Sequence, residues 1–365
     1  MADLVQEQNV IAKELNLPLL KRRIKAWASE CGFSSVGITD IDFSKDKKYL
    51  DKWIENGFHG EMHYMERNLS KRENPEELVN GTKRIISLTM NYLPQSYNGK
   101  ETLENTDKAF VSGYATGRDY HKLMRSRLKK LVSKIKEYSP HENRVFVDSA
   151  PVLEKSIARK AGLGWVGKNT LLMNKKSGSY FFLGEIYTDL ELPVDKPHIE
   201  SHCGTCTSCM DVCPTDAFVG PYQLDARKCI SYLTIEHKGS IDIDLRSKIG
   251  NRIFGCDDCQ IFCPWNKFTQ HTTEEDFQPR HNLDDAYLCD LFLWSEEEFN
   301  KKTEGSAIRR AGYVGWLRNI SVALGNADYS IKNLETLRIR ENFPSEIVRE
   351  HVNWAIQEQL RKVNE

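Results

Sequence analysis

The sequence predicts an α+β protein in three parts. Helical and strand-like segments alternate over residues 1–195, and eight of the ten cysteines fall within residues 196–270. Residues 271–365 contain helical periods and almost no strand signal. Strands separated by helices fit an α/β or an α+β layered domain. The cysteine-rich part is too small and too rich in thiols to rest on a large apolar core, so we expect metal to organise it.

The first part contains several segments of clear periodicity. Apolar residues at helical or buried-strand spacing define most of them. We expect helices over 18–31, 118–138 and 153–161, and strands over 35–39, 85–92, 145–147 and 180–190. In the last part, AIRRAGYVGWLRNISVALGN and SEIVREHVNWAIQEQL show helical periods. These two segments favour a short helical-repeat region.

Composition excludes some classes of protein. The 365 residues carry a net charge of −1, so a polyanionic partner would have to meet a local basic patch. The N-terminal segment lacks the pattern of a secretory signal, and no run approaches the roughly 18 apolar residues of a membrane helix. We therefore expect a cytoplasmic protein without membrane contact. Thiols stay reduced there, so clustered cysteines indicate metal rather than disulfides.

Cysteine spacing carries the strongest signal. The run CGTCTSCMDVCP follows the pattern C-x2-C-x2-C-x3-C-P of two-cluster ferredoxins, in which the fourth cysteine binds the other cluster. A second run, CDDCQIFCP, supplies three more cysteines, and Cys229 stands between the runs. Exchanging the fourth ligands fills two iron–sulfur sites: Cys203, Cys206, Cys209 and Cys263 for cluster one; Cys213, Cys229, Cys256 and Cys259 for cluster two.

Two alternatives accompany this assignment. Two structural zinc sites would also use four cysteines each, although zinc sites usually show pairs of CxxC rather than a triple followed by Cys-Pro. Cys31 and Cys289 lie outside the pattern, and we expect both to be small buried hydrophobic residues. A pair of clusters needs a second redox site, yet the GxGxxG fingerprint is absent. The glycine-rich segment 161–169 is either a ligand-contacting loop or a simple turn.

The longest motifs resemble one family. VDSAPVLEKSIARKAGLGWVGKNTLL, the ferredoxin-type run, FGCDDCQIFCPWN and the helical AIRRAGYVGWLRNISVALGN, in this order, resemble the epoxyqueuosine reductases over nearly the whole chain. The resemblance implies reduction of epoxyqueuosine to queuosine at the wobble position of tRNA. It also implies two [4Fe-4S] clusters and cobalamin as cofactors, and three domains: a cobalamin-binding reductase core (1–195), a ferredoxin-like domain (196–270) and a helical HEAT-like domain (271–365).

The same resemblance implies partners and cofactor contacts. We expect a monomer that binds a tRNA anticodon stem-loop and receives electrons from an external donor such as a flavodoxin or ferredoxin. The DxHxxG signature of other cobalamin proteins is incomplete, because Met124 stands where glycine is needed. Family members bind cobalamin without a histidine under the cobalt, so we expect His121 to be a surface or tRNA-facing residue. The expected cofactor contacts are Arg67, Asp148, Asn169, Ser231, Cys256, Asp257, Asp258 and Cys259.

Asp148 is the candidate proton donor. It follows the strand expected over 145–147, and burial against an apolar cofactor would raise its pKa so that it protonates the epoxide oxygen. From the residues alone, a helix-capping or turn aspartate ahead of Pro151 and the following helix is an equal alternative. The resemblance favours the acid. Asp257 and Asp258 have the alternative of being solvated charges beside a cluster.

Basic residues supply candidate tRNA contacts. Phosphate contacts give affinity rather than sequence recognition. We expect contacts from Lys238, Arg309, Arg310 and Arg318, with Arg125, Arg127, Lys129 and Lys130 as a further basic stretch that is otherwise a solvated helix face. Tyr313 and Trp316 either stack on bases or pack the helices, and packing is favoured for Trp316.

Two other functions fit the same features. A reductive dehalogenase acting on a small organohalide would use the same cofactors, but the export signal common in that class is absent and the basic tail would be superfluous. A ferredoxin-type electron carrier would need only the clusters. The roughly 195 residues before them argue against a simple carrier.

Overall fold

A four-stranded sheet forms the centre of the first part of the protein. The computed structural model describes residues 16–363. The strand order is β1-β2-β7-β4, and every neighbouring pair is antiparallel. The strands are β1 (Ser35–Thr39), β2 (Arg84–Asn91), β4 (Asn143–Phe146) and β7 (Phe181–Thr188). The expected α+β class is confirmed. These four strands do not form the parallel sheet of an α/β fold.

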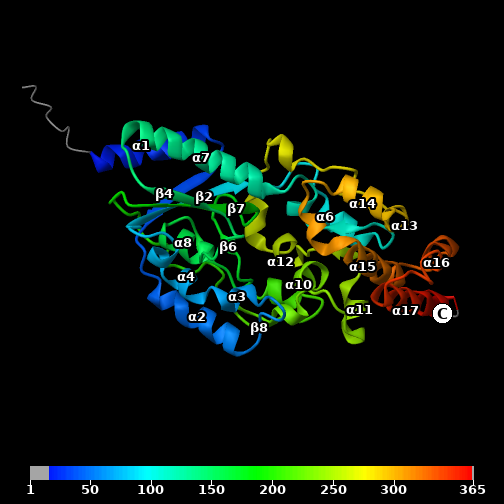
Figure 1. The fold of residues 1–365 in the computed structure, drawn as a ribbon. Coiled ribbons are helices and arrows are strands. Elements are labelled where there is room, and N and C mark those ends of the chain that lie inside the picture. Colours follow the sequence, from blue (N-terminus) through cyan, green and yellow to red (C-terminus); the bar gives the residue numbers. More distant parts are fainter. Residues whose placement is uncertain (1–15, 364–365) are drawn as a thin grey trace, which may run out of the picture.

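Helices cover the two faces of this sheet (Figure 1). On one face lie α1 (Leu17–Glu30) and α7 (Tyr120–Tyr138), whose buried apolar residues pack with those of β2 and β7. On the other face lies α8 (Glu154–Lys160). Side chains alternate between faces along a strand, so Ile86 and Leu88 contact α1 and α7 while Ile85 and Tyr187 pack with α8. All seven expected elements are present, with ends that differ by at most two residues from the expected ones.

Short elements lie between and beyond these strands. Residues 44–78 form several helices, and two small antiparallel ribbons follow later. The bounds are α2 (Ser44–Glu55), α3 (Tyr64–Arg67), α4 (Leu69–Glu73), α5 (Pro75–Leu78), α6 (Gly99–Glu104), β3 (Phe110–Val111), β5 (Trp165–Val166), β6 (Leu172–Met173), β8 (Phe218–Gly220) and β9 (Gln223–Leu224).

The cysteine-rich part consists of short helices and loops. Its helices are α9 (Ser208–Asp211), α10 (Ile230–Ile235), α11 (Ile243–Ile249) and α12 (Asp258–Ile261). One strand, β10 (Arg252–Phe254), pairs in parallel with β3 of the first part. The cysteine-bearing loops are therefore fixed against the first part of the protein by backbone hydrogen bonds, and not only by side chains.

The C-terminal part is helical, as expected. It contains α13 (Leu288–Phe292), α14 (Glu296–Lys302), α15 (Gly312–Asn326), α16 (Ile331–Arg338) and α17 (Glu346–Lys362). Its core includes residues of β3 and β10, so one apolar cluster crosses both domain boundaries drawn from the sequence. Trp316 is fully buried, and the Tyr313 hydroxyl donates to the Trp294 carbonyl. Both aromatic residues pack helices, so stacking of Tyr313 on bases is not supported.

No helix among residues 16–363 is long and apolar enough to cross a membrane. The expected absence of a secretory signal concerns a segment that lies mostly outside the described residues.

Candidate functional site

Two cavities divide the eight cysteines of the motif into two sets of four. A cavity of about 370 Å³ is lined by Cys203, Cys206, Cys209 and Cys263. A larger cavity of about 1080 Å³ is lined by Cys213, Cys229, Cys256 and Cys259. These are the two sets that the crossed ferredoxin pattern predicts. The fold thus brings the last cysteine of each run, Cys213 or Cys263, to the other run.

The chemistry of these thiols suits clusters bound as thiolates. No cysteine of the chain forms a disulfide. Burial, together with the negative charge of neighbouring acidic groups and thiolates, raises the pKa of Cys256 and Cys259 well above the ordinary value. Burial also raises the pKa of Cys209 to about 11. Metal coordination would offset this cost, because a metal-bound thiol is deprotonated. The four-plus-four donor set therefore fits two iron–sulfur clusters.

Asn169 connects the two cavities. It is buried, it lines both of them, and its side-chain amide donates to the carbonyl of Cys259. Lys168 donates to the carbonyls of Gly204 and Cys206. The segment 161–169 is therefore a loop that holds both cysteine runs. Of the two sequence interpretations, the ligand-contacting loop fits better than the simple turn.

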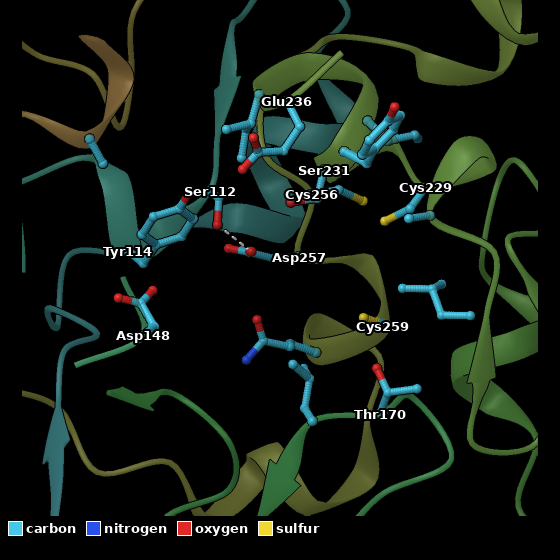
Figure 2. A pocket seen from close by; sticks show the side chains of 18 of the residues that line it. Ser112, Tyr114, Asp148, Thr170, Cys229, Ser231, Glu236, Cys256, Asp257 and Cys259 are labelled. Atoms are coloured by element: carbon cyan, nitrogen blue, oxygen red, sulfur yellow. Dashed lines mark hydrogen bonds between the residues drawn. The ribbon is translucent and has the colours of Figure 1, made fainter. Parts of the chain in front are cut away.

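The wall opposite the cysteines carries an array of polar side chains. Figure 2 shows Asp148 across the larger cavity from Cys229, Cys256 and Cys259. Asp148 accepts hydrogen bonds from the Tyr120 hydroxyl and from His121, whose Nε2 lies 2.8 Å from Oδ1. The other ring nitrogen of His121 lies 2.5 Å from Asp119 Oδ1. Tyr120 stacks on Phe182 of β7 with ring centroids 3.8 Å apart, which fixes the array to the sheet.

This geometry corrects the expectation for His121. The residue lines the cavity and is half-buried between two carboxylates, so it is not a surface residue. Burial disfavours the imidazolium, but the hydrogen bonds and charges of Asp119 and Asp148 outweigh it and raise the pKa of His121 to about 9. The imidazole nitrogens are engaged, which leaves none free for cobalt.

It also corrects the expected state of Asp148. Burial alone would raise the pKa of Asp148, as expected, but hydrogen bonds from His121 and Tyr120 outweigh it and lower that pKa. The proton of this array therefore resides on His121 near neutral pH. Asp148 lies between that proton and the cavity. Of the other alternative, a helix-capping or turn aspartate, the turn part holds, because Asp148 lies in the turn after β4, whereas the residue that caps α8 is Leu153.

Asp257 and Asp258 are buried rather than solvated. Asp257 accepts hydrogen bonds from Ser112, Tyr97 and the Gly113 amide, and burial raises its pKa. Asp258 forms an ion pair with Arg252 on the strand β10. Both aspartates line the larger cavity, and so does Ser231. Their carboxylates bind protein groups, so any cofactor contact they make adds to a structural role.

Arg67 does not line the larger cavity. It is exposed on α3, while its neighbours Tyr64 and Asn68 are among the lining residues. A short helix presents these positions in different directions, and no pattern in the sequence indicates which of them faces the cavity. The structure therefore does not place Arg67 with the other expected cofactor contacts, and its contact stays a prediction.

The basic candidates divide into exposed and buried residues. Arg309 and Arg310 are exposed and line the larger cavity, and Lys238 is exposed beside them, with its Nζ 2.7 Å from the Arg310 carbonyl. Arg318 is 1% exposed and donates to the carbonyls of Leu233, His237 and Gly239. Burial lowers its pKa to about 10. Arg318 therefore cannot contact tRNA phosphates and instead holds the loop that carries Lys238.

The residues of the other basic stretch, 125–130, differ in their contacts. Arg127 pairs with Glu274, and Arg125 donates to Ser149 beside the array. Lys129 and Lys130 are exposed, as a solvated helix face predicts. Sequence reasoning missed Tyr120, although it lies between the two residues of the Asp119–His121 pattern. It also missed Tyr97 and Ser112, which bond Asp257. Both are far from Asp257 in the sequence, so no local pattern indicated these contacts.

The fold and site define a redox enzyme. Two four-cysteine sites lie next to each other, and one of them opens onto the larger cavity. The opposite wall of that cavity carries the hydrogen-bonded pair of His121 and Asp148. The cavity exceeds the 300–1,000 Å³ typical of small-molecule sites, so it has room for a large cofactor together with substrate.

Comparisons with known proteins identify the family. The family described as "4Fe-4S double cluster binding domain" matches residues 202–266, and that described as "Epoxyqueuosine reductase QueG, DUF1730" matches residues 72–149. The epoxyqueuosine reductase of Pseudomonas aeruginosa is 59% identical, covering 92% of this chain and 94% of the relative. That of Escherichia coli is 52% identical, covering 97% and 93%.

Solved structures agree. An epoxyqueuosine reductase bound to an epoxyqueuosine-modified tRNA stem loop matches with a TM-score of 0.86 and 29% identity, covering 94% of this chain and 91% of that one. The enzyme from Streptococcus thermophilus matches with a TM-score of 0.83, 29% identity and coverage of 94% and 90%. The chain belongs to the epoxyqueuosine reductase family, so the simple electron carrier and the dehalogenase are both set aside.

Proposed function

We propose that this chain reduces epoxyqueuosine to queuosine at the wobble position of tRNA, using two [4Fe-4S] clusters and cobalamin. The observation that carries the proposal is that one cavity joins the second cysteine set on one wall to Asp148 on the other. When bound, the clusters would supply electrons one at a time, and the corrin would supply the reducing metal. Conversion of an epoxide to an alkene and water consumes two electrons and two protons.

The cysteine sets would hold the clusters. Cys203, Cys206, Cys209 and Cys263 lie on the side where Cys206 is exposed, which favours entry of electrons from an external donor such as a flavodoxin or ferredoxin. Cys213, Cys229, Cys256 and Cys259 would hold the inner cluster against the larger cavity. Asn169, Ser231 and the loop at Asp257 and Asp258 would contact the corrin.

Proton delivery falls to the array on the opposite wall. The His121 imidazolium would give its proton to the Asp148 carboxylate, and Asp148 would pass that proton to the epoxide oxygen. Tyr120 and Asp119 hold these two groups in line. Support for a movable aspartate comes from a Bacillus subtilis epoxyqueuosine reductase described with a catalytic aspartate loop swung out of its active site.

Exposed basic residues at the cavity would bind the RNA. Lys238, Arg309 and Arg310 would contact phosphates of the anticodon stem-loop, and a single-stranded loop lets the modified base swing into the cavity at low cost. The relative solved with a modified tRNA stem loop supports this partner. A monomer would suffice, because one chain supplies every part of the site.

The test is anaerobic turnover of epoxyqueuosine-containing tRNA. Protein reconstituted with iron and sulfide is assayed with and without added cobalamin, and iron and cobalt are counted in the same samples. We expect turnover only with both cofactors. Equal rates from cobalamin-free protein would remove the corrin from the proposal, and zinc in place of iron would remove the clusters.

A further inference from the structure

Glu185 is a buried acid that the site described so far does not use. It lies in the middle of β7, it is 0% exposed, and neither carboxyl oxygen has a hydrogen-bond partner. A buried polar group without a partner is unfavourable, because nothing compensates for the loss of its hydration. Such a group in the centre of the sheet therefore needs an explanation other than packing.

A second unpartnered group faces it. Ser87 of β2 is the register partner of Glu185, it is 0% exposed, and its hydroxyl also has no partner. Directly paired residues of antiparallel strands point to the same face of the sheet. Buried polar groups lacking protein partners are satisfied by internal water. The Ser87–Glu185 pair is thus a place for internal water beneath α8.

The pair lies on the face of the sheet that leads to Asp148. Glu185 lies on the same face of β7 as Leu183 and Tyr187, which pack with α8. Its partner on β4 is Phe146, two residues before Asp148. Glu154, the first residue of α8, is half-buried on this same side. Three carboxyl groups are therefore associated with this part of the fold: Asp148 in the cavity wall, Glu154 at the start of α8 and Glu185 in the middle of β7.

Electrostatics orders the three acids. Burial, and next the charge of Asp148, raises the pKa of Glu154 to about 7. Burial, and next the charges of Glu154 and Asp148, raises the pKa of Glu185 well above its ordinary value. The other charged groups near Glu154 are Lys155 of α8, Arg72 of α4 and His121 of α7. Proton affinity is therefore lowest at Asp148 and is raised at both Glu154 and Glu185.

We propose that Glu154 and Glu185 form an internal proton store that reprotonates Asp148, with water between Ser87 and Glu185 completing the path. This inference rests on the proposed function, since reduction of one epoxide consumes two protons and the His121 imidazolium supplies only one. In the proposed step the O–H bond of Glu154 breaks and an O–H bond forms on Asp148. Glu185 then returns a proton to Glu154, and solvent reloads both through Glu154 between turnovers.

Turnover tests the delivery of protons. Glu154→Gln and Glu185→Gln keep shape and neutrality but carry no transferable acid proton. We expect kcat to fall at least about tenfold in each, with KM for the tRNA unchanged. The wild-type decline of kcat as pH rises through about 7 should disappear in Glu154→Gln. Glu137→Gln, on the exposed side of α7, is the matched control and should leave kcat unchanged.

Infrared spectroscopy tests the store without substrate. At pH 7 the wild-type protein should show a protonated-carboxyl band that Glu185→Gln loses. A second band, assigned by its loss in Glu154→Gln, should titrate near pH 7 and shift to lower pH in Asp148→Asn, which lacks the charge that raises it. These spectra separate failure of this inference from failure of the proposed function, because they do not depend on epoxyqueuosine.

Specific outcomes would overturn the inference. One is a wild-type kcat and pH profile in both glutamine variants. Another is that Glu185→Gln loses no carboxyl band. A third is that the Glu154 band titrates at the same pH in Asp148→Asn as in the wild type. Should Glu185→Gln not fold, Ser87→Ala removes the other polar partner of the internal water. It should lower kcat in the same direction, and a wild-type kcat there counts against the store.

Discussion

The Nε2 atom of His121 lies 2.8 Å from Oδ1 of Asp148, at the edge of the larger cavity. This relationship joins α7, on one face of the central sheet, to the loop that follows β4. It places the proton of the array on the imidazole rather than on the carboxyl group. Four predictions follow from the site as described.

Asp148→Ala should abolish turnover while leaving the cofactor sites intact. Asp148 is on the wall opposite the cysteines, so its loss should not alter iron content or corrin absorbance. Loss of a positioned general acid typically costs about 10²–10⁴-fold in rate. Single-turnover assays with modified tRNA measure the effect, with Asp189→Ala, outside the cavity lining, as a control. Normal turnover of Asp148→Ala would show that the acid is elsewhere.

His121→Gln should change the pH dependence of both activity and stability. The folded-state pKa of His121 is raised from 6.5 to about 9, so the folded protein binds this proton more tightly than the unfolded chain. Its contribution to stability is complete below pH 6.5 and is lost as pH rises to about 9. Urea unfolding across pH 6–10 should show this decline in the wild type and not in His121→Gln. An identical decline in both proteins contradicts the assignment.

Arg318 and Arg309 should behave in opposite ways. Arg318→Ala leaves three buried carbonyls without their donor, at about 1 kcal/mol or more each, so the free energy of unfolding should fall by about 3 kcal/mol. Arg309→Ala should leave stability unchanged and weaken tRNA binding. The slope of log K against log salt should become shallower by about 0.7–0.9. Binding titrations at several salt concentrations, with thermal melts, distinguish the two.

Cys256→Ala should remove the inner cluster. Cys256 lines the larger cavity with the other three cysteines of its set, so the variant should retain about half of the iron per chain. Reduction of cobalamin should stop with it. Cys289→Ala, a buried cysteine whose thiol lies 3.1 Å from Asn333 Oδ1, should keep all of the iron. Full iron content in Cys256→Ala would contradict the ligand set.

Patterns that are local in sequence predicted their part of the molecule well. The strand over 35–39 and the helix over 118–138 follow from the spacing of apolar residues, which is a property of neighbouring positions. The cysteine spacing predicted the two sets of four for the same reason, since a tight loop dictates which thiols point to one metal cluster.

Other features depended on residues that meet only in the folded chain. The burial of Arg318 was not predictable, because its partners are carbonyls about 80 residues earlier in the chain. The ionisation of Asp148 was predicted wrongly, because its pKa depends on a histidine that α7 brings within hydrogen-bonding distance. Likewise, nothing near Glu185 in sequence indicated that Ser87 would face it.

The sequence by itself therefore determined the elements, the grouping of the eight motif cysteines into two sets of four and the family, because these are carried by short-range spacing and by motif order. Tertiary structure alone decided which charges are buried, which carboxyl groups hold protons and which arginines reach solvent. The physical reason is that desolvation and hydrogen bonding act over a few ångströms in space, and such distances are set only when distant segments pack together.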